Sequence, residues 1–447
     1  MIADTNFSLF VSSCLIVINA SWIGIFIIST RSYHLIPRID RFKTRPPLQA
    51  LPVPVPLQRS AKNAAVPSTR VSNLSNISLP FVSIIVPARD EEKNIERCLS
   101  SLLDQDYPSF EIIAIDDNST DNTLQIMKKI KENNTNCLET NKLKIVSLDD
   151  KPGRWTGKAW ASHQGYLHAQ GEILLFTDAD TFFFDGDVIL HSISYLQNEK
   201  LDVLTGHAKM ELPDFWSKIT MPLWDLIYYA IIRNRNPGDA NNTSSSAAYL
   251  VGSFYMLHRK VLEKIGGFQS VQGAIKEDVE LGIRIKRAGF KLKVANMDKF
   301  YSAAWCRDFS TLWHGVGRTF LPMSKIRMAA ILVSLFFLAL FPLLIFPYSV
   351  FSYEATLVKN YHMTCNNLVC FLTLMSNISC YMMIIIGIAI SNIKNYSINA
   401  AYSLLTFAAL LLITSASLAN IVHFLVGQKR VQWRNRTYKY NSEKLIV

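Results

Sequence analysis

The sequence predicts an α/β domain flanked by membrane-spanning helices. Short β-branched runs alternate with helical patterns over residues 81–300, and long uncharged apolar runs lie on both sides. Hydrophobic residues make up 49% of the chain and charged residues only 18%, but these averages combine a charged middle with apolar ends. A chain of 447 residues is long enough for more than one domain.

The N-terminal apolar run predicts a membrane anchor. Residues 7–29 carry no charge, which is long enough to cross about 30 Å of hydrocarbon. No basic residue precedes the run and no small-residue cleavage site is evident, so an anchor is favoured over a cleaved signal peptide. Basic residues follow it at Arg31, Arg38, Arg41, Lys43 and Arg45. The positive-inside rule then places the N-terminus outside and the next residues in the cytoplasm.

The middle of the chain predicts a linker and then a layered domain. Residues 46–80, rich in Pro, Ser, Asn and Ala, predict a weakly ordered linker. Strand and helix patterns then alternate, which implies right-handed βαβ units and a mostly parallel sheet. The predicted strands are 81–88, 110–117, 143–148 and 172–180, and the predicted helices are 91–105, 120–133 and 157–170.

The C-terminal third is apolar again. Region 326–425 contains candidate spans at 328–350, 367–390 and 401–425, and a basic tail follows at 426–447. Four spans with the N-terminus outside would leave this tail outside, against the positive-inside rule. One segment is therefore expected to be re-entrant or interfacial, and the Pro-broken 328–348 is the first candidate. The net charge of +11 is explained by such membrane topology before nucleic acid is invoked.

Carboxylates gather where the predicted strands end. The second strand ends in Asp116-Asp117 and the fourth in Asp178-Ala179-Asp180. In an open parallel sheet, ligands bind beyond the carboxyl ends of the strands. Clustered acids repel unless a cation offsets them, and Mg²⁺ or Mn²⁺ bridging to a diphosphate would do so. Taken singly, Asp178-Ala179-Asp180 is more typical of a strand-end turn with solvated acids. The acids after the second strand are as typical of a helix N-cap as of a ligand site.

Together these motifs resemble the membrane-anchored family-2 glycosyltransferases of GT-A fold. The resemblance is carried by "VSIIVPARDEEKNIERCLSSLLDQDYPSFEIIAIDDNSTDNT" (82–123), "GKAWASHQGYLHAQGEILLFTDADT" (157–181), "VGSFYMLHRKVLEKIGGF" (251–268) and "KEDVELGIRIKRAGFKL" (276–292). It covers about residues 81–320 and predicts a GT-A domain, an α/β nucleotide-diphospho-sugar transferase fold, over 81–325. The arrangement is similar to that of hopanoid- and carotenoid-pathway lipid glycosyltransferases.

The resemblance implies a role for each matching residue. The donor nucleotide would be bound by Pro87, Ala88, Arg89, Glu91, Asp116, Asp117, Lys158 and Asp178. Asp178 and Asp180 would hold a divalent cation on the donor diphosphate. In the pair Glu277-Asp278, the aspartate would be the general base. Asp278 also begins a predicted helix, so the pair could instead serve as a helix cap.

One part of the family pattern differs. Processive synthases carry Gln-x-x-Arg-Trp near the end of the domain, where this chain reads "RDFSTLWHGVGRTF" (307–320). Trp313 and Arg318 could have a role related to that of this motif, at the acceptor or the diphosphate. The difference favours transfer of a single sugar over chain extension.

An aromatic and basic stretch at 213–235 predicts an interfacial helix, with a helix on the sheet or across the membrane as the alternative. The sequence and the resemblance together predict an inverting enzyme that moves one sugar to a lipid or hydrophobic acceptor at the cytoplasmic membrane face. The resemblance alone implies that the donor is a UDP-sugar. A polysaccharide synthase and a non-catalytic scaffold are the alternatives.

Overall fold

The structure is a computed structural model that describes most, but not all, of the chain. The described residues are 10–11, 13–25, 27, 36–39, 79–135, 142–227, 237–242, 247–304, 306–319, 325–335, 344, 346–347, 350–351, 354, 365–425, 430–433, 436–441 and 444–445. Most of the predicted linker (46–80) and about half of the first C-terminal span (328–350) lie outside these residues.

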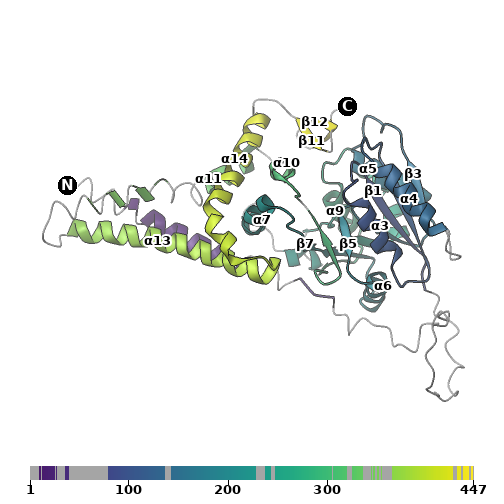
Figure 1. The fold of residues 1–447 in the computed structure, drawn as a ribbon, viewed down its shortest axis with the longest axis horizontal. Helices are drawn as coiled ribbons and strands as arrows, with labels where there is room; N and C mark the ends of the chain where they lie inside the picture. Colours follow the sequence, from purple (N-terminus) through teal and green to yellow (C-terminus); the bar gives the residue numbers. More distant parts are fainter. Residues whose placement is uncertain are drawn as a thin grey trace, which may run out of the picture.

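The described residues contain a seven-stranded sheet at the centre of an α/β domain (Figure 1). Its strands, in spatial order, are β3 (Leu143–Ser147), β2 (Phe110–Asp116), β1 (Val82–Ala88), β4 (Ile173–Phe176), β8 (Tyr255–His258), β6 (Val203–His207) and β9 (Leu292–Asn296). The helices of this domain are α3 (Ile95–Leu103), α4 (Thr123–Thr135), α5 (Gly157–His168), α6 (Val188–Asn198), α8 (Arg259–Lys264) and α9 (Glu277–Arg287).

The predicted α/β class is confirmed, with one strand reversed. Strands β3, β2, β1 and β4 pair in parallel, as expected from the βαβ pattern. Strand β8 is antiparallel to both of its neighbours, and β6 and β9 are parallel again. The sequence pattern did not separate β6, β8 and β9 into elements. The fourth predicted strand is also shorter than expected and ends at Phe176, so Asp178 and Asp180 lie in the turn beyond it.

The sheet is buried on both faces because its strands alternate two sets of apolar side chains. Ile84 and Val86 pack with the face covered by α3, α4 and α6. Ile85 and Ile113 pack with the opposite face, covered by α5, α8 and α9. This period-two division explains why the strands are apolar throughout. Packing on both faces fixes the positions of the strands. The acids that follow the strand ends are therefore held at one edge of the sheet.

Two smaller features border the main sheet. A three-stranded sheet joins β5 (Thr181–Phe183), β10 (Tyr301–Ala303) and β7 (Lys209–Met210). Residues 36–39 lie along β9, where Asn296 N donates to Pro37 O at 2.8 Å. The chain that follows the N-terminal helix is therefore attached to the edge of the domain.

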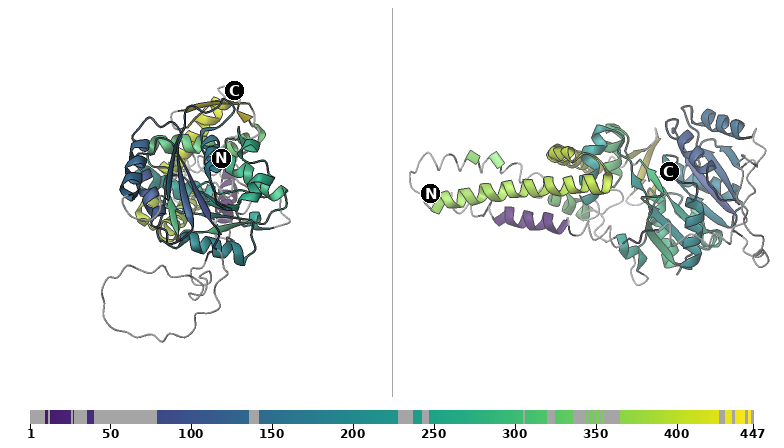
Figure 2. Two further views of the ribbon diagram at one scale, coloured as in Figure 1. Left: turned by 90° about the vertical axis from the view of Figure 1, so that its right-hand side faces the viewer. Right: turned by 60° about the horizontal axis from the view of Figure 1, so that its bottom comes forward.

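A second apolar core joins helices from distant parts of the chain. These are α7 (Phe215–Ile227), α10 (Phe309–Thr319), α11 (Lys325–Leu335), α13 (Cys365–Ser391), α14 (Thr406–Leu425) and the N-terminal helix Ser13–Ile25. Helix α13 extends far from the sheet (Figure 1), and the N-terminal helix lies beside it (Figure 2), where Asn19 Nδ2 donates to Ser376 O at 3.3 Å.

By length and composition, two helical stretches among the described residues could cross a membrane, Phe371–Tyr396 and Ala400–Val422. They correspond to the second and third predicted C-terminal spans. Helix α13 exposes large apolar side chains along its length: Leu372, Met382 and Ile386 are each about half exposed. The predicted interfacial helix 213–235 corresponds to α7 as far as Ile227, and residues 228–236 lie outside the described part.

The close contact of α5 with the sheet gives a stability prediction. A Cβ at Gly165 would lie 2.3 Å from Ile85 Cγ2 and 3.3 Å from Ile115 Cγ1, both in the buried core. Gly165→Ala should lower the free energy of unfolding by roughly 1–3 kcal/mol, although alanine favours the helix. Leu167→Ala, at an exposed position of the same helix, is the control and should change stability little. Thermal denaturation in detergent measures both. Equal melting temperatures for the two variants would contradict the packing.

Candidate functional site

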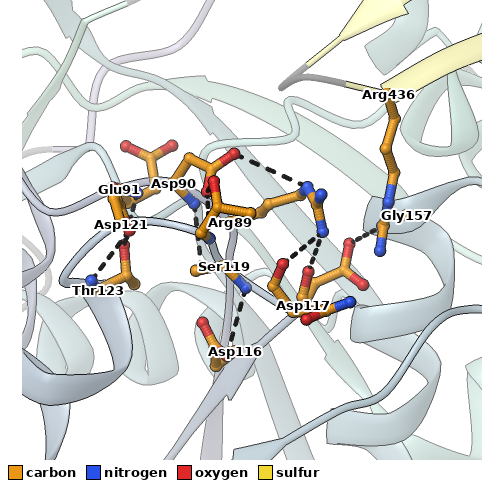
Figure 3. A network of polar contacts seen from close by, with 12 residues as sticks. Arg89, Asp90, Glu91, Asp116, Asp117, Ser119, Asp121, Thr123, Gly157 and Arg436 are labelled. Carbon is orange, nitrogen blue, oxygen red and sulfur yellow. Dashed lines mark hydrogen bonds and ion pairs between the residues drawn. The ribbon is translucent and has the colours of Figure 1, made fainter.

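The ends of β1 and β2 form one group of predicted site residues (Figure 3). Asp117 N donates to Ala88 O at 2.8 Å, so the strand ends are tied together. The Arg89 guanidinium reaches across and donates to the backbone oxygens of Asp117 and Asn118, at 2.5 and 2.7 Å. The carboxylates of Asp116 and Asp117 are almost fully buried. This group has the composition expected for recognition of a polar ligand at a strand end.

The two loops beyond these strands are joined by further polar contacts. Asp90 N donates to Ser119 Oγ, and Thr120 N donates to Asp90 Oδ1 at 2.8 Å. Glu91 is buried and accepts from Asn94 Nδ2 at 2.6 Å, so its carboxylate is turned toward the start of α3. Its backbone N–H donates to Thr123 Oγ1. The described contacts of Glu91 are thus those of a loop-ordering residue, and its predicted role at the donor stays a prediction.

A second group surrounds the buried Lys158 ammonium. Lys158 Nζ lies 2.5 Å from Asp178 Oδ1 and 3.6 Å from Glu277 Oε1. A Cβ built at Gly252 would lie 2.8 Å from this nitrogen and 2.9 Å from Asp278 Oδ2. Asp278 Oδ1 accepts from Val279 N at 2.7 Å, so one oxygen meets the first turn of α9 while the other faces Gly252. The geometry is therefore compatible with both roles considered for Asp278, as a helix cap and as a residue that faces the site.

Burial and mutual charge govern the protonation of this second group. Burial raises the pKa of Glu277 to about 7 and raises the pKa of Asp278, while Lys158 opposes both shifts. Burial disfavours the charged form of Lys158, but the carboxylates of Asp178, Glu277 and Asp278 outweigh it and raise the pKa of the ammonium. Lys158 therefore stays charged and offsets part of the negative charge of the cluster.

Helix α5 connects the two groups. Gly157 and Lys158 are its first residues, and a Cβ at Gly157 would lie 2.6 Å from Asp117 Oδ2. The positive end of the helix dipole is thus placed between the two sets of acids. An anion bound at this end of the helix could contact both groups of residues at once.

The turn after β4 carries the predicted metal ligands Asp178 and Asp180. Cys98 of α3 lies behind it, and burial, with the charges of Asp180, Glu91 and Asp178, raises the pKa of that thiol to about 12. Among the residues that the structure describes, no three His, Cys, Asp or Glu side chains converge as they would on a metal ion. Asp178 and Asp180 alone are too few to hold a cation, so they suit one that shares the oxygens of a diphosphate.

The predicted acceptor residues belong to α10, in the second apolar core. Trp313 packs against that core and contacts Phe309, with ring centroids 5.8 Å apart. Phe309 in turn contacts Trp216 of α7 at 5.1 Å. The side chain of Arg318 lies outside the described residues. No described contact joins Trp313 to the Lys158 group.

Three residues near the predicted site had no role assigned from the sequence. Gly252 was inside a segment that resembles the family, but nothing in the pattern marked its close approach to Lys158. Arg436 and Tyr438 were assigned only to the basic tail. Yet Arg436 Nη1 lies 2.5 Å from Asp117 Oδ2, and Gly157 N donates to Tyr438 Oη at 3.1 Å. No local signal in the sequence could have found contacts across about 300 residues of chain.

Two glycines at the Lys158 group should respond differently to a methyl group. At Gly282, a Cβ would lie 2.6 Å from the backbone of Tyr249, so Gly282→Ala should destabilise the fold by roughly 1–3 kcal/mol. At Gly252, the Cβ meets the ends of the Lys158, Asp278 and Asp178 side chains and no backbone atom among its nearest neighbours, and side-chain ends can rotate away. Gly252→Ala should therefore leave the melting temperature close to that of the wild type. A larger loss for Gly252→Ala than for Gly282→Ala would contradict the geometry.

Comparison with known proteins assigns a family to part of the chain. Residues 83–266 match the sequence profile described as glycosyl transferase family 2. Curated relatives include a β-monoglucosyldiacylglycerol synthase of Nostoc sp., 29% identical over 248 residues, or 53% of this chain and 47% of the relative. A 4,4'-diaponeurosporenoate glycosyltransferase of Staphylococcus aureus is 28% identical over 211 residues, or 46% of this chain and 52% of the relative. The chain spans about half the length of these relatives.

A poly-β-1,6-N-acetyl-D-glucosamine synthase of Staphylococcus epidermidis is 27% identical over 213 residues, or 47% of both chains. Among solved structures, a mannosyltransferase of Pyrobaculum calidifontis in complex with GDP-Man and Mn²⁺ matches 93% of this chain and 99% of its own, at 17% identity and a TM-score of 0.46. The profile match and the mixed sheet agree with the family and fold that the sequence predicted, and residues 83–266 form a glycosyl transferase family 2 domain of GT-A fold.

Proposed function

We propose that this protein is a membrane-bound inverting glycosyltransferase. It transfers a single sugar from a UDP-sugar to a lipid or hydrophobic acceptor at the cytoplasmic face of the membrane. The observation that carries the proposal is the Lys158 group, in which α5, the turn after β4 and the start of α9 meet within ion-pair distance. The family match supports it, as do relatives named as a β-monoglucosyldiacylglycerol synthase and a 4,4'-diaponeurosporenoate glycosyltransferase.

The two groups of the site suit the two ends of a nucleotide-diphosphate sugar. The buried acids after β2, with Arg89, would bind the ribose and base. Lys158 and the N-terminus of α5 would face the diphosphate, and Asp178 and Asp180 would hold a Mg²⁺ or Mn²⁺ ion on it. When bound, that cation would neutralise charge on the leaving diphosphate.

Asp278 is the proposed general base. Its Oδ2 faces Gly252 beside Lys158, on the same side as the proposed diphosphate position. In the reaction, the acceptor hydroxyl gives its proton to this carboxylate, and its oxygen bonds to the anomeric carbon. The bond from that carbon to the diphosphate oxygen breaks, and the diphosphate leaves with the electron pair. The sugar configuration inverts in this single displacement.

The acceptor would approach from the second apolar core. Ile275, two residues before Glu277, packs against the core that contains α7, α10 and α14. Phe215 and Trp216 at the start of α7 are partly exposed, as suits a helix at a membrane interface. The apolar outer face of α13 would contact lipid, and the basic residues after the N-terminal helix would place the domain in the cytoplasm. The domain boundaries predicted from the sequence are part of this proposal.

Substitution of the proposed base should separate chemistry from binding. Asp278→Asn should lower the transfer rate by roughly 10²–10⁴ because the acceptor loses its proton acceptor, while donor binding stays nearly unchanged. Glu280→Gln is the control, since Glu280 lies in the same helix and its carboxylate forms an i,i+4 pair with Arg284. Transfer of radiolabelled sugar to extracted lipid and calorimetric donor binding measure the two effects. Loss of donor binding in Asp278→Asn would contradict the assignment.

Cation removal provides the test of the donor site and of the enzyme class. Purified protein in lipid nanodiscs, given a panel of nucleotide sugars and a lipid extract, should form a glycolipid that carries one sugar. EDTA should abolish the activity and Mn²⁺ or Mg²⁺ should restore it, because the two carboxylates need a cation to bind the diphosphate. A ladder of polymeric products would instead favour the polysaccharide synthase. Absence of turnover and of binding with every donor would favour the non-catalytic scaffold.

A further inference from the structure

The end of the chain lies against the proposed nucleotide site. A hairpin of β11 (Arg430–Trp433) and β12 (Arg436–Asn441) carries Arg436 to Asp117, and their side chains are only 13% and 3% exposed (Figure 3). This ion pair joins positions 319 residues apart. Both side chains are removed from water, and a buried charge is costly unless it is paired. The Arg436–Asp117 pair therefore differs from a chance contact at the surface.

The hairpin makes a second contact at the same place. Tyr438 is buried, and its hydroxyl oxygen accepts from Gly157 N, the first residue of α5. A Cβ at Gly157 would lie 2.6 Å from Asp117 Oδ2, 2.7 Å from Arg436 Nη1 and 3.1 Å from the Tyr438 hydroxyl. There is no room for a methyl group among these side chains. The tail is therefore fitted closely against both β2 and α5.

Buried polar atoms of this ion pair, and of the neighbouring Asp116, lack hydrogen-bond partners among the described residues. Asp116 Oδ1, Asp117 Oδ1 and Arg436 Nη2 form no hydrogen bond within the part of the chain that the structure describes. Asp150 Oδ1 lies 3.9 Å from Arg436 Nη2, beyond hydrogen-bonding distance. Buried polar atoms are nearly always hydrogen-bonded. The ion pair itself thus keeps one unpaired acceptor, Asp117 Oδ1, and one unpaired donor, Arg436 Nη2. These match a ligand that offers a hydroxyl or N–H donor together with an acceptor, as a ribose with its base does.

We propose that Arg436 is a positioning residue for the donor: it holds the Asp117 carboxylate in place to bind the ribose or base of the nucleotide, and the C-terminal hairpin completes that end of the site. The inference rests on the proposed function and adds to it a segment outside the family 2 domain. Arg436 acts through Asp117, and its free Nη2 can also donate to the nucleotide itself.

The charges around Asp117 determine how removal of the Arg436 side chain should affect nucleotide binding. The facing groups are Arg436 of β12, Arg89 after β1, Asp116 of β2 and Lys151 before α5. Burial raises the pKa of Asp117 to about 6, and the positive charge of Arg436 limits the rise. Nucleotide binding to the ionised carboxylate should thus be complete above this pKa and lost as the pH falls through it. Without Arg436 the loss should begin at a higher pH.

The experiment compares Arg436→Met, Arg436→Lys and the wild type in the full chain. UDP binding, with GDP in parallel, is measured by calorimetry from pH 5.5 to 8.5, and transfer gives kcat and the donor KM. Arg436→Met should weaken UDP binding and raise the donor KM about tenfold or more, with kcat nearly unchanged, and should move the binding midpoint to higher pH. Arg436→Lys should restore part of the binding. Arg284→Met, which removes an exposed pair on α9, is the matched control.

Three outcomes would overturn the inference. Tighter UDP binding or a higher kcat/KM in Arg436→Met would mean that the hairpin obstructs the site. A lower melting temperature with unchanged UDP affinity and pH midpoint would mean that Arg436 serves only the fold. Absence of UDP and GDP binding by the wild type would instead refute the proposed function, and the inference with it, so the two failures are distinguishable.

Discussion

One buried ammonium group makes the proposed catalytic site possible. Lys158 begins α5 and reaches Asp178 beyond β4 and Glu277 at the start of α9. Three separate segments thus bring carboxylates together around Lys158, whose positive charge opposes the rise in pKa that burial and mutual repulsion cause. The parallel strands and the two apolar layers set the positions of these segments. Lys158 allows the charges to remain there.

Much of the fold was predictable because its signals are local. The alternating strands β1 to β4 and their helices follow from short-range periodicity, and the acids after β2 and β4 follow from where those strands end. The reversed strand β8 and the strands β6 and β9 were not separable, since buried strands of either direction look alike in sequence. The approach of Gly252 to Lys158 and the pairing of Arg436 with Asp117 depend on tertiary packing alone, so no local pattern encodes them.

The two apolar cores have different tasks, although their residues are alike in type. The cores on each face of the sheet fix the strand ends. The helical core of α7, α10, α13 and α14 reaches the site through Ile275, which precedes Glu277. An acceptor dissolved in a membrane and a donor dissolved in water would therefore meet at one short segment of chain. Hydropathy alone identifies these helices as apolar but does not reveal which of them border the site.

The contact of the C-terminal hairpin with the domain also constrains membrane topology. Because Arg436 pairs with Asp117, the tail and the domain must lie on the same side of any membrane that the protein crosses. The chain between them must then cross an even number of times. If α13 and α14 each cross, as the sequence predicts, a third crossing by segment 328–350 would break this parity. With an even number of crossings, the basic tail would lie on the cytoplasmic side with the domain. The tail would then obey the positive-inside rule, which four spans in all would violate.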